Sequence, residues 1–127
     1  METPASSFRQ RLLIEALVVA AASAPDQTMW LEKHGVTTDE IALDFEHAFR
    51  MVERLAEEGL LGRDALPDLR MIDSIFDEMT RDETKDRWTT AALGSDPVWC
   101  RVRGLAQSVL VREGVDASVL RDIRVVR

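Results

Sequence analysis

Apolar side chains recur every three or four residues along most of this chain, and that spacing is the strongest restriction on its fold. Segment 38–58 has an apolar stripe with a period near 3.6, the repeat of an α-helix. The stripe consists of Ile41, Phe45, Ala48, Phe49, Val52, Leu55 and Ala56. Segments 69–79 and 98–110 carry similar stripes. Since each such helix must bury one face, the sequence predicts an all-α fold, a single compact bundle of five to seven helices over residues 1–127.

Residue types that start and stop helices divide these stripes. Ser6 and Ser7 are suitable caps for a first helix over about 7–23, which Pro25 ends. The second half of this helix is apolar on every face, so we expect it to be central. Gly35 is placed to end a short helical turn that follows.

Two later segments match the capping-box pattern, in which a threonine precedes a glutamate by three positions. The pattern at 37–40 opens the predicted helix 38–58, and Gly59 supplies its stop. The pattern at 80–83 predicts a helix that ends near Gly94.

Two aspartates mark further starts. Asp68 is expected to cap the helix that carries the 69–79 stripe. Asp96 followed by Pro97 is a cap choice with proline at the first helical position, and the helix should run to about residue 112. Residues 112–127 are predicted to form a tail, either a short helix or an extended arm.

The charge of the chain favours a basic partner. The formal net charge is −7 over 127 residues. Residues 37–86 hold fifteen acids and six bases, a net charge of −9, whereas residues 97–127 hold three acids and six bases, a net charge of +3. Nucleic acids require clustered Lys and Arg, so we do not expect nucleic-acid binding. A basic protein is the better match for the acidic middle.

Some acids in this middle region are matched by a base one turn away, Glu46 by Arg50 and Glu58 by Arg54. Others are predicted to be unpaired, among them Glu53, Glu57 and the acids Asp73, Asp77 and Glu78 on the polar face of one helix. Some of these acids repel each other. Asp73 and Asp77 are like charges at i,i+4, as are Glu53 and Glu57, and each pair costs a few tenths of a kcal/mol. Two readings are open: a solvated face that aids solubility, or a docking surface for a basic protein. On the second reading the predicted partner-binding residues are Asp73, Asp77, Glu78, Asp82, Glu53 and Glu57.

Catalytic and metal-binding patterns are poorly matched. His47 lies three residues after Asp44, but diiron bundles need two E-x-x-H motifs and two further glutamates. Cys100 lies next to Trp99 in a predicted helix, where a buried structural thiol is the expected role. No glycine-rich phosphate-binding motif occurs. We therefore expect no enzyme activity, no metal and no cofactor.

Trp88 and Trp99 flank the break "GSDP". Both fall on apolar patterns, so they are predicted to anchor the packing of a helical hairpin. A ligand-stacking role is the alternative. In the packing role each indole N–H still needs an acceptor.

Features near the N-terminus bear on the compartment. The stretch "RQRLLIEALVVAAASAP" has the basic and apolar parts of a secretory signal, but Glu15 interrupts it and Pro25 would follow the cleavage site. We interpret it as a buried helix, and it is too short to span a bilayer. The lone Cys100 makes no internal disulfide, which favours a reducing compartment. The prediction is a cytoplasmic protein with no membrane association.

The series "LRMIDSIFDEM", "RWTTAAL" and "DPVWCRVRGLAQSVL" resembles small acidic immunity proteins of contact-dependent growth inhibition and related bacterial polymorphic toxin systems. The resemblance covers residues 30–112 and consists of packing residues rather than a catalytic signature. It implies a protein that binds one cognate toxin domain and neutralises it by occluding the active site or a neighbouring surface. Many such toxins are nucleases, whose clefts must be positive to attract phosphates.

Two other functions are open. The segment "DEIALDFEHAFRMVERLAEEGLL" is similar to the end of a winged-helix transcriptional regulator, although it carries more acids than bases. An accessory protein-interaction module without a toxin is the second alternative.

Overall fold

The computed structural model describes residues 4–115, with side chains from residue 7 onward. It confirms the predicted all-α bundle, and the described residues contain seven α-helices and no strand. The elements are α1 (Pro4–Ala21), α2 (Ala24–His34), α3 (Asp39–Phe49), α4 (Val52–Glu57), the short 3₁₀ turn η1 (Arg63–Ala65), α5 (Leu66–Arg81), α6 (Thr90–Ser95) and α7 (Pro97–Arg112).

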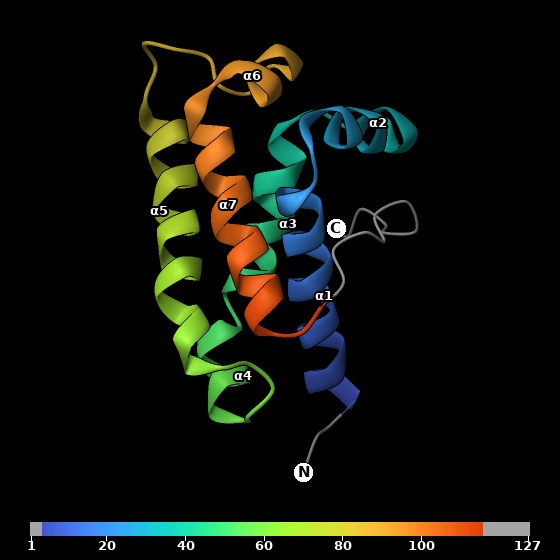
Figure 1. The fold of residues 1–127 in the computed structure, drawn as a ribbon, viewed down its shortest axis with the longest axis vertical. Helices are drawn as coiled ribbons and strands as arrows, with labels where there is room; N and C mark the ends of the chain where they lie inside the picture. The colour runs from blue at the N-terminus through green and yellow to red at the C-terminus, as the bar shows by residue number, and fades with distance from the viewer. Residues whose placement is uncertain (1–3, 116–127) are drawn as a thin grey trace.

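Four helices form the body of the molecule. Helix α1 packs against α3 and α7, and α5 packs against the same two helices from the other side. Consecutive members of this set of four run in alternating directions, as Figure 1 shows. Helices α2 and α6 contact each other at one end of the bundle, and α4 lies at the opposite end.

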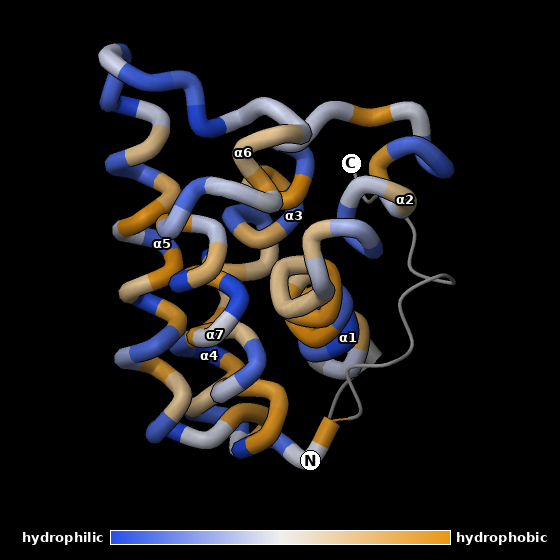
Figure 2. Tube along the Cα trace, turned by 45° about the horizontal axis from the view of Figure 1, so that its top comes forward, coloured by the Kyte–Doolittle hydropathy of each residue, from blue (hydrophilic) through white to orange (hydrophobic). Residues whose placement is uncertain are grey.

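The core lies between these four helices, where each turns its apolar stripe inward. Helix α1 is central as predicted, with Leu17 and Ala20 fully buried. Along α5 the hydrophobic positions lie toward the other helices and the hydrophilic ones lie at the outer edge (Figure 2). This arrangement agrees with the helical spacing of the apolar stripe over 69–79 in the sequence. No helix in the described part of the chain is long and apolar enough to cross a membrane.

Several predicted helix starts are wrong. Helix α1 begins at Pro4, so Ser6 and Ser7 lie inside it rather than at its cap. Pro25 lies within the first turn of α2, where its missing N–H costs nothing, and Ser23 is the cap. Gly35 does end α2, in a left-handed conformation with φ of 63°.

The predicted long helix 38–58 is two helices. It breaks at Arg50 and Met51, and Met51 has φ of −104° and ψ of 0°, outside the helical region. Thr38 rather than Thr37 is the N-cap, and its side chain makes no capping hydrogen bond. Gly59 ends α4 with φ of 77°, as predicted.

The predicted helix over 80–94 is also wrong. Helix α5 starts at Leu66, so Asp68 is not its cap, and it continues to Arg81. A loop over 82–89 follows, and Thr89 caps the short α6 by accepting a hydrogen bond from the Ala92 amide at 3.1 Å.

Helix α7 begins as predicted. The Asp96 carboxylate accepts a hydrogen bond from the Val98 amide at 3.0 Å, and Pro97 occupies the first turn. The helix ends at Arg112, and the predicted tail beyond residue 115 lies outside the described residues.

Candidate functional site

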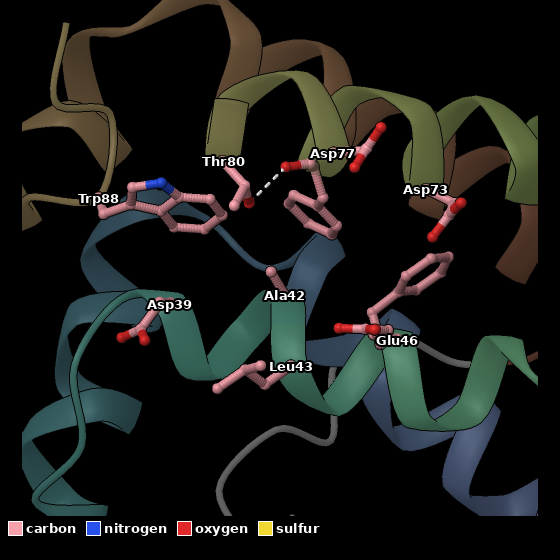
Figure 3. Close-up of a pocket in the computed structure, with 10 residues that line it drawn as sticks. Asp39, Ala42, Leu43, Glu46, Asp73, Asp77, Thr80 and Trp88 are labelled. Atoms are coloured by element: carbon pink, nitrogen blue, oxygen red, sulfur yellow. Dashed lines mark hydrogen bonds between the residues drawn. The ribbon is translucent and has the colours of Figure 1, made fainter. Parts of the chain in front are cut away.

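A groove lies between α3 and α5 and is closed at one end by the indole of Trp88 (Figure 3). Its volume is about 680 Å³. Its lining residues are Asp39, Ala42, Leu43, Phe45, Glu46, Asp73, Phe76, Asp77, Thr80 and Trp88. We call this feature the α3–α5 groove.

The floor of the α3–α5 groove is aromatic. The rings of Phe45 and Phe76 meet edge to face with centroids 5.8 Å apart, and Phe76 contacts Trp88 at 6.2 Å. Both phenylalanines are buried core residues, so the floor is fixed by the packing of the bundle. Ala42 has a small side chain and lines the groove from α3.

Carboxylates stand on both walls. Asp39 and Glu46 come from α3, and Asp73 and Asp77 come from α5. In Figure 3, Asp39 lies near Trp88, whereas Glu46 and Asp73 lie toward the other end. The groove therefore combines an apolar floor with four negative charges along its length.

The four carboxylates differ in their partners. Glu46 lies 3.6 Å from Arg50, which directly follows α3, and Asp77 lies 2.8 Å from Arg81, one turn further along α5. Asp39 accepts a hydrogen bond from the Thr37 hydroxyl. Asp73 forms no ion pair among the described residues.

The environment of Asp73 disfavours its charge. Partial burial and then the nearby carboxylates of Asp77 and Glu46 raise the pKa of Asp73 above its usual value of 3.8. The cations beside these two carboxylates are paired with them, Arg81 with Asp77 and Arg50 with Glu46. Asp73 is thus held as an anion at some cost, which a cation placed in the groove would relieve.

We predict that Asp73→Asn stabilises the folded protein at neutral pH by about 0.5 kcal/mol, because it removes like-charge repulsion. The sign follows from linkage. A carboxyl whose pKa is raised in the folded state lowers the free energy of unfolding when it is ionised. This cost decreases as the pH falls through the folded-state pKa and is gone below the pKa of the unfolded chain. Urea unfolding at neutral pH and near pH 4 should show that the gain shrinks in acid. Equal gains at both pH values would contradict the assignment.

Only two of the six predicted partner-binding acids line the α3–α5 groove. Asp73 and Asp77 do so. The prediction that Asp77 is unpaired is wrong, because Arg81 lies one turn away and forms an ion pair with it. Glu78 is exposed on α5 and does not line the groove. Asp73, Asp77 and Glu78 therefore do not all face the groove.

Asp82 has a structural role in the loop that follows α5. Its carboxylate accepts hydrogen bonds from the Thr84 backbone and hydroxyl and pairs with Arg87 at 2.7 Å. The Thr84 and Arg87 hydrogen bonds lower the pKa of Asp82 to about 2. These contacts occupy the side chain within the loop.

Glu53 and Glu57 lie on α4 and do not line the groove. The predicted absence of a partner for Glu53 is wrong, since Arg70 of α5 lies 2.8 Å away. Glu57 is exposed.

Asp39 and Glu46 line the groove but are not among the predicted site residues, and Trp88 was given a ligand-stacking role only as the alternative to packing. Asp39 and Glu46 are seven positions apart, which puts them on one face of α3 two turns from each other. The sequence contains this spacing, but it does not show that α5 lies opposite and makes this face one wall of a groove. Trp88 was assigned to a helix, whereas it lies in the 82–89 loop and is half-buried.

The loop that carries Trp88 is fastened to the start of α7. Arg87 reaches Asp82 and, at 3.2 Å, the buried Asp96. The Trp99 indole N–H donates to the Arg87 carbonyl at 2.8 Å. Trp99 also meets the Trp88 ring edge to face, with centroids 5.9 Å apart. This network holds Trp88 at the end of the groove.

The other candidate residues do not converge. His47 is exposed on α3, and His34 ends α2 with its ring 4.9 Å from that of Trp30. Cys100 is exposed, so the prediction of a buried structural thiol is wrong. Within the described residues, no three His, Cys, Asp or Glu side chains are arranged to hold a metal ion.

Comparison of the chain with protein-family models, with curated proteins and with solved structures gives no match.

Proposed function

We propose that this chain is an immunity protein that binds a basic bacterial toxin domain and neutralises it. The observation that supports this function is the α3–α5 groove, where four carboxylates surround an aromatic floor. The cleft of a nuclease must be positive to attract phosphates. An acidic groove is complementary to such a cleft, or to a basic surface beside it, and the opposite charges would steer the two proteins together.

The chemistry of the groove also argues for a protein partner. Protein interfaces are enriched in aromatic side chains and arginine, and arginines of a partner would meet the carboxylates of the groove. The half-buried Trp88 and the exposed Leu43 give the groove apolar contact area beside its acids. A regulator that binds DNA would need Lys and Arg at this surface, and the α3–α5 groove is lined by neither.

Growth of bacteria that express a toxin tests the proposal. The immunity function predicts that a secreted toxin is encoded beside this gene, and the probe is the C-terminal domain of that toxin. We expect this domain to stop growth when expressed alone, and co-expression of the present chain to restore colony counts. The two purified proteins should co-elute in gel filtration at low salt.

An unrelated helical protein of equal net charge serves as the control and should not protect. Undiminished killing in the presence of this chain would refute the immunity function. Salt-sensitive binding to random duplex DNA would instead favour the transcriptional regulator. Capture of a non-toxic basic protein would favour the accessory module.

A further inference from the structure

The walls of the α3–α5 groove repeat their chemistry at helical spacing. On α3, Asp39 and Glu46 are two turns apart, about 10 Å at 1.5 Å per residue, and Ala42 and Phe45 lie between them. On α5, Asp73 and Thr80 span the same distance, with Phe76 and Asp77 between them. The groove therefore has carboxylates toward both ends, Asp39 near Trp88 and Glu46 with Asp73 at the far end, while Asp77 lies between them on the α5 wall (Figure 3).

We infer that the groove takes a short helix of a protein partner, in which two basic residues two turns apart flank an apolar side chain. The inference rests on the proposed function in one respect, that a basic protein docks at this groove. It adds the secondary structure of the docking element and the register of its contacts.

The spacing supports a helix as the occupant. Two helices that pack side by side have the same pitch, so cations at i and i+7 of the partner can meet acids at both ends of the groove. Residues i+3 and i+4 lie on the same face between these cations and would rest on Ala42 and the accessible edge of Phe76. Amphipathic helices dock in apolar grooves in this way.

One cation cannot form ion pairs with the acids at both ends of the groove. An ion pair needs N and O atoms within about 4 Å, whereas the acids of α3 are about 10 Å apart along the helix axis. Asp73 needs a cation at one end, since no described ion pair neutralises it and Asp77 and Glu46 repel it. Asp39 and Trp88 at the other end offer a carboxylate and an aromatic ring, a pair that suits arginine.

Two alanine-based peptides of one composition, each about 15 residues long so that it has helical content, test the register. The in-register peptide carries Arg at i and i+7 and Leu at i+3 and i+4. The scrambled peptide carries the same residues with Arg and Leu on opposite faces. Calorimetry should show that the in-register peptide binds the full chain about tenfold more tightly, a difference of about 1.4 kcal/mol.

Proton–nitrogen correlation spectra locate the binding. The indole resonance of Trp88 should shift on addition of the in-register peptide. The resonance of Trp30, which is 2% exposed and does not line the groove, should not shift. A shift of Trp30 without Trp88 would place the peptide elsewhere and overturn the inference.

Matched variants of α5 separate the groove from general charge attraction. Asp73→Asn should weaken the in-register peptide about fivefold, near the upper limit for an exposed ion pair. Glu78→Gln removes the same charge from the same helix outside the groove and should change the affinity less than about twofold. Equal losses in the two variants would overturn the inference, as would equal affinities for the two peptides or for free arginine amide.

The two proposals fail in different ways. If the toxin domain is neutralised but the in-register peptide does not bind, the helix inference is wrong and the immunity function stands. If the in-register peptide binds but growth is not restored, the inference that the groove binds a basic helix stands and the immunity function is wrong.

Discussion

Trp99→Ala is expected to lower the free energy of unfolding by about 3–5 kcal/mol, the range for a large buried aromatic. Trp99 is fully buried, and its ring lies 5.6 Å from that of Phe76 and 5.9 Å from that of Trp88. The truncation leaves a cavity and also removes the donor to the Arg87 carbonyl. Chemical denaturation followed by circular dichroism measures the loss, which is a large share of the stability of a domain.

Val111→Ala on the same helix is the matched control. Val111 is 78% exposed, so its truncation should change stability by less than about 0.5 kcal/mol. A loss below about 1 kcal/mol for Trp99→Ala, with partner binding abolished, would instead identify Trp99 as an interface hot spot. The loss of support for Trp88 should also weaken peptide binding at the groove.

The sequence predicted the helices best where several local signals agree. Helix α7 starts at a good cap followed by proline and carries an apolar stripe, and its start and end match the structure. Gly35 and Gly59 mark real helix ends because both have positive φ, which glycine adopts without steric cost. In such places the local preference and the packed fold favour the same conformation.

The errors occur where tertiary contacts decide. The apolar period continues through Met51, so nothing local shows that α3 and α4 are separate helices. The break lets α4 pack against α1 at the end of the bundle. The capping pattern at 80–83 fails because Asp82 instead bonds to Thr84 and Arg87, which stabilises a loop.

The sequence predicted two of the four carboxylates of the groove as site residues. Asp73 and Asp77 were predicted to bind a partner because like charges one turn apart are unfavourable, and this pair does line the groove. Asp39 and Glu46 showed no such conflict along the sequence. Their significance arises only from the packing of α3 against α5, and Trp88 joins them because the Arg87 contacts fix its loop.

Charge reversal on the α5 wall should have the largest effect on partner binding. We expect the double variant Asp73→Lys, Asp77→Lys to slow association with the toxin domain about tenfold or more and to abolish protection of growing cells. Both residues line the groove, and opposite charges chiefly accelerate encounter. Stopped-flow or surface-based kinetics measure the rate, and the wild-type rate should fall as salt rises.

The control with the same change in net charge is Glu57→Lys, Glu78→Lys. Both of these side chains are exposed and lie outside the groove. If attraction depended only on the total charge of the chain, the two double variants would slow association equally. If the groove is the docking site, the control should associate within about threefold of wild type, because exposed charges that make no contact with the partner act only through solvent, where salt weakens them. A wild-type rate for Asp73→Lys, Asp77→Lys, with protection retained, would move the docking surface away from α5 and leave its acids as a solvated face.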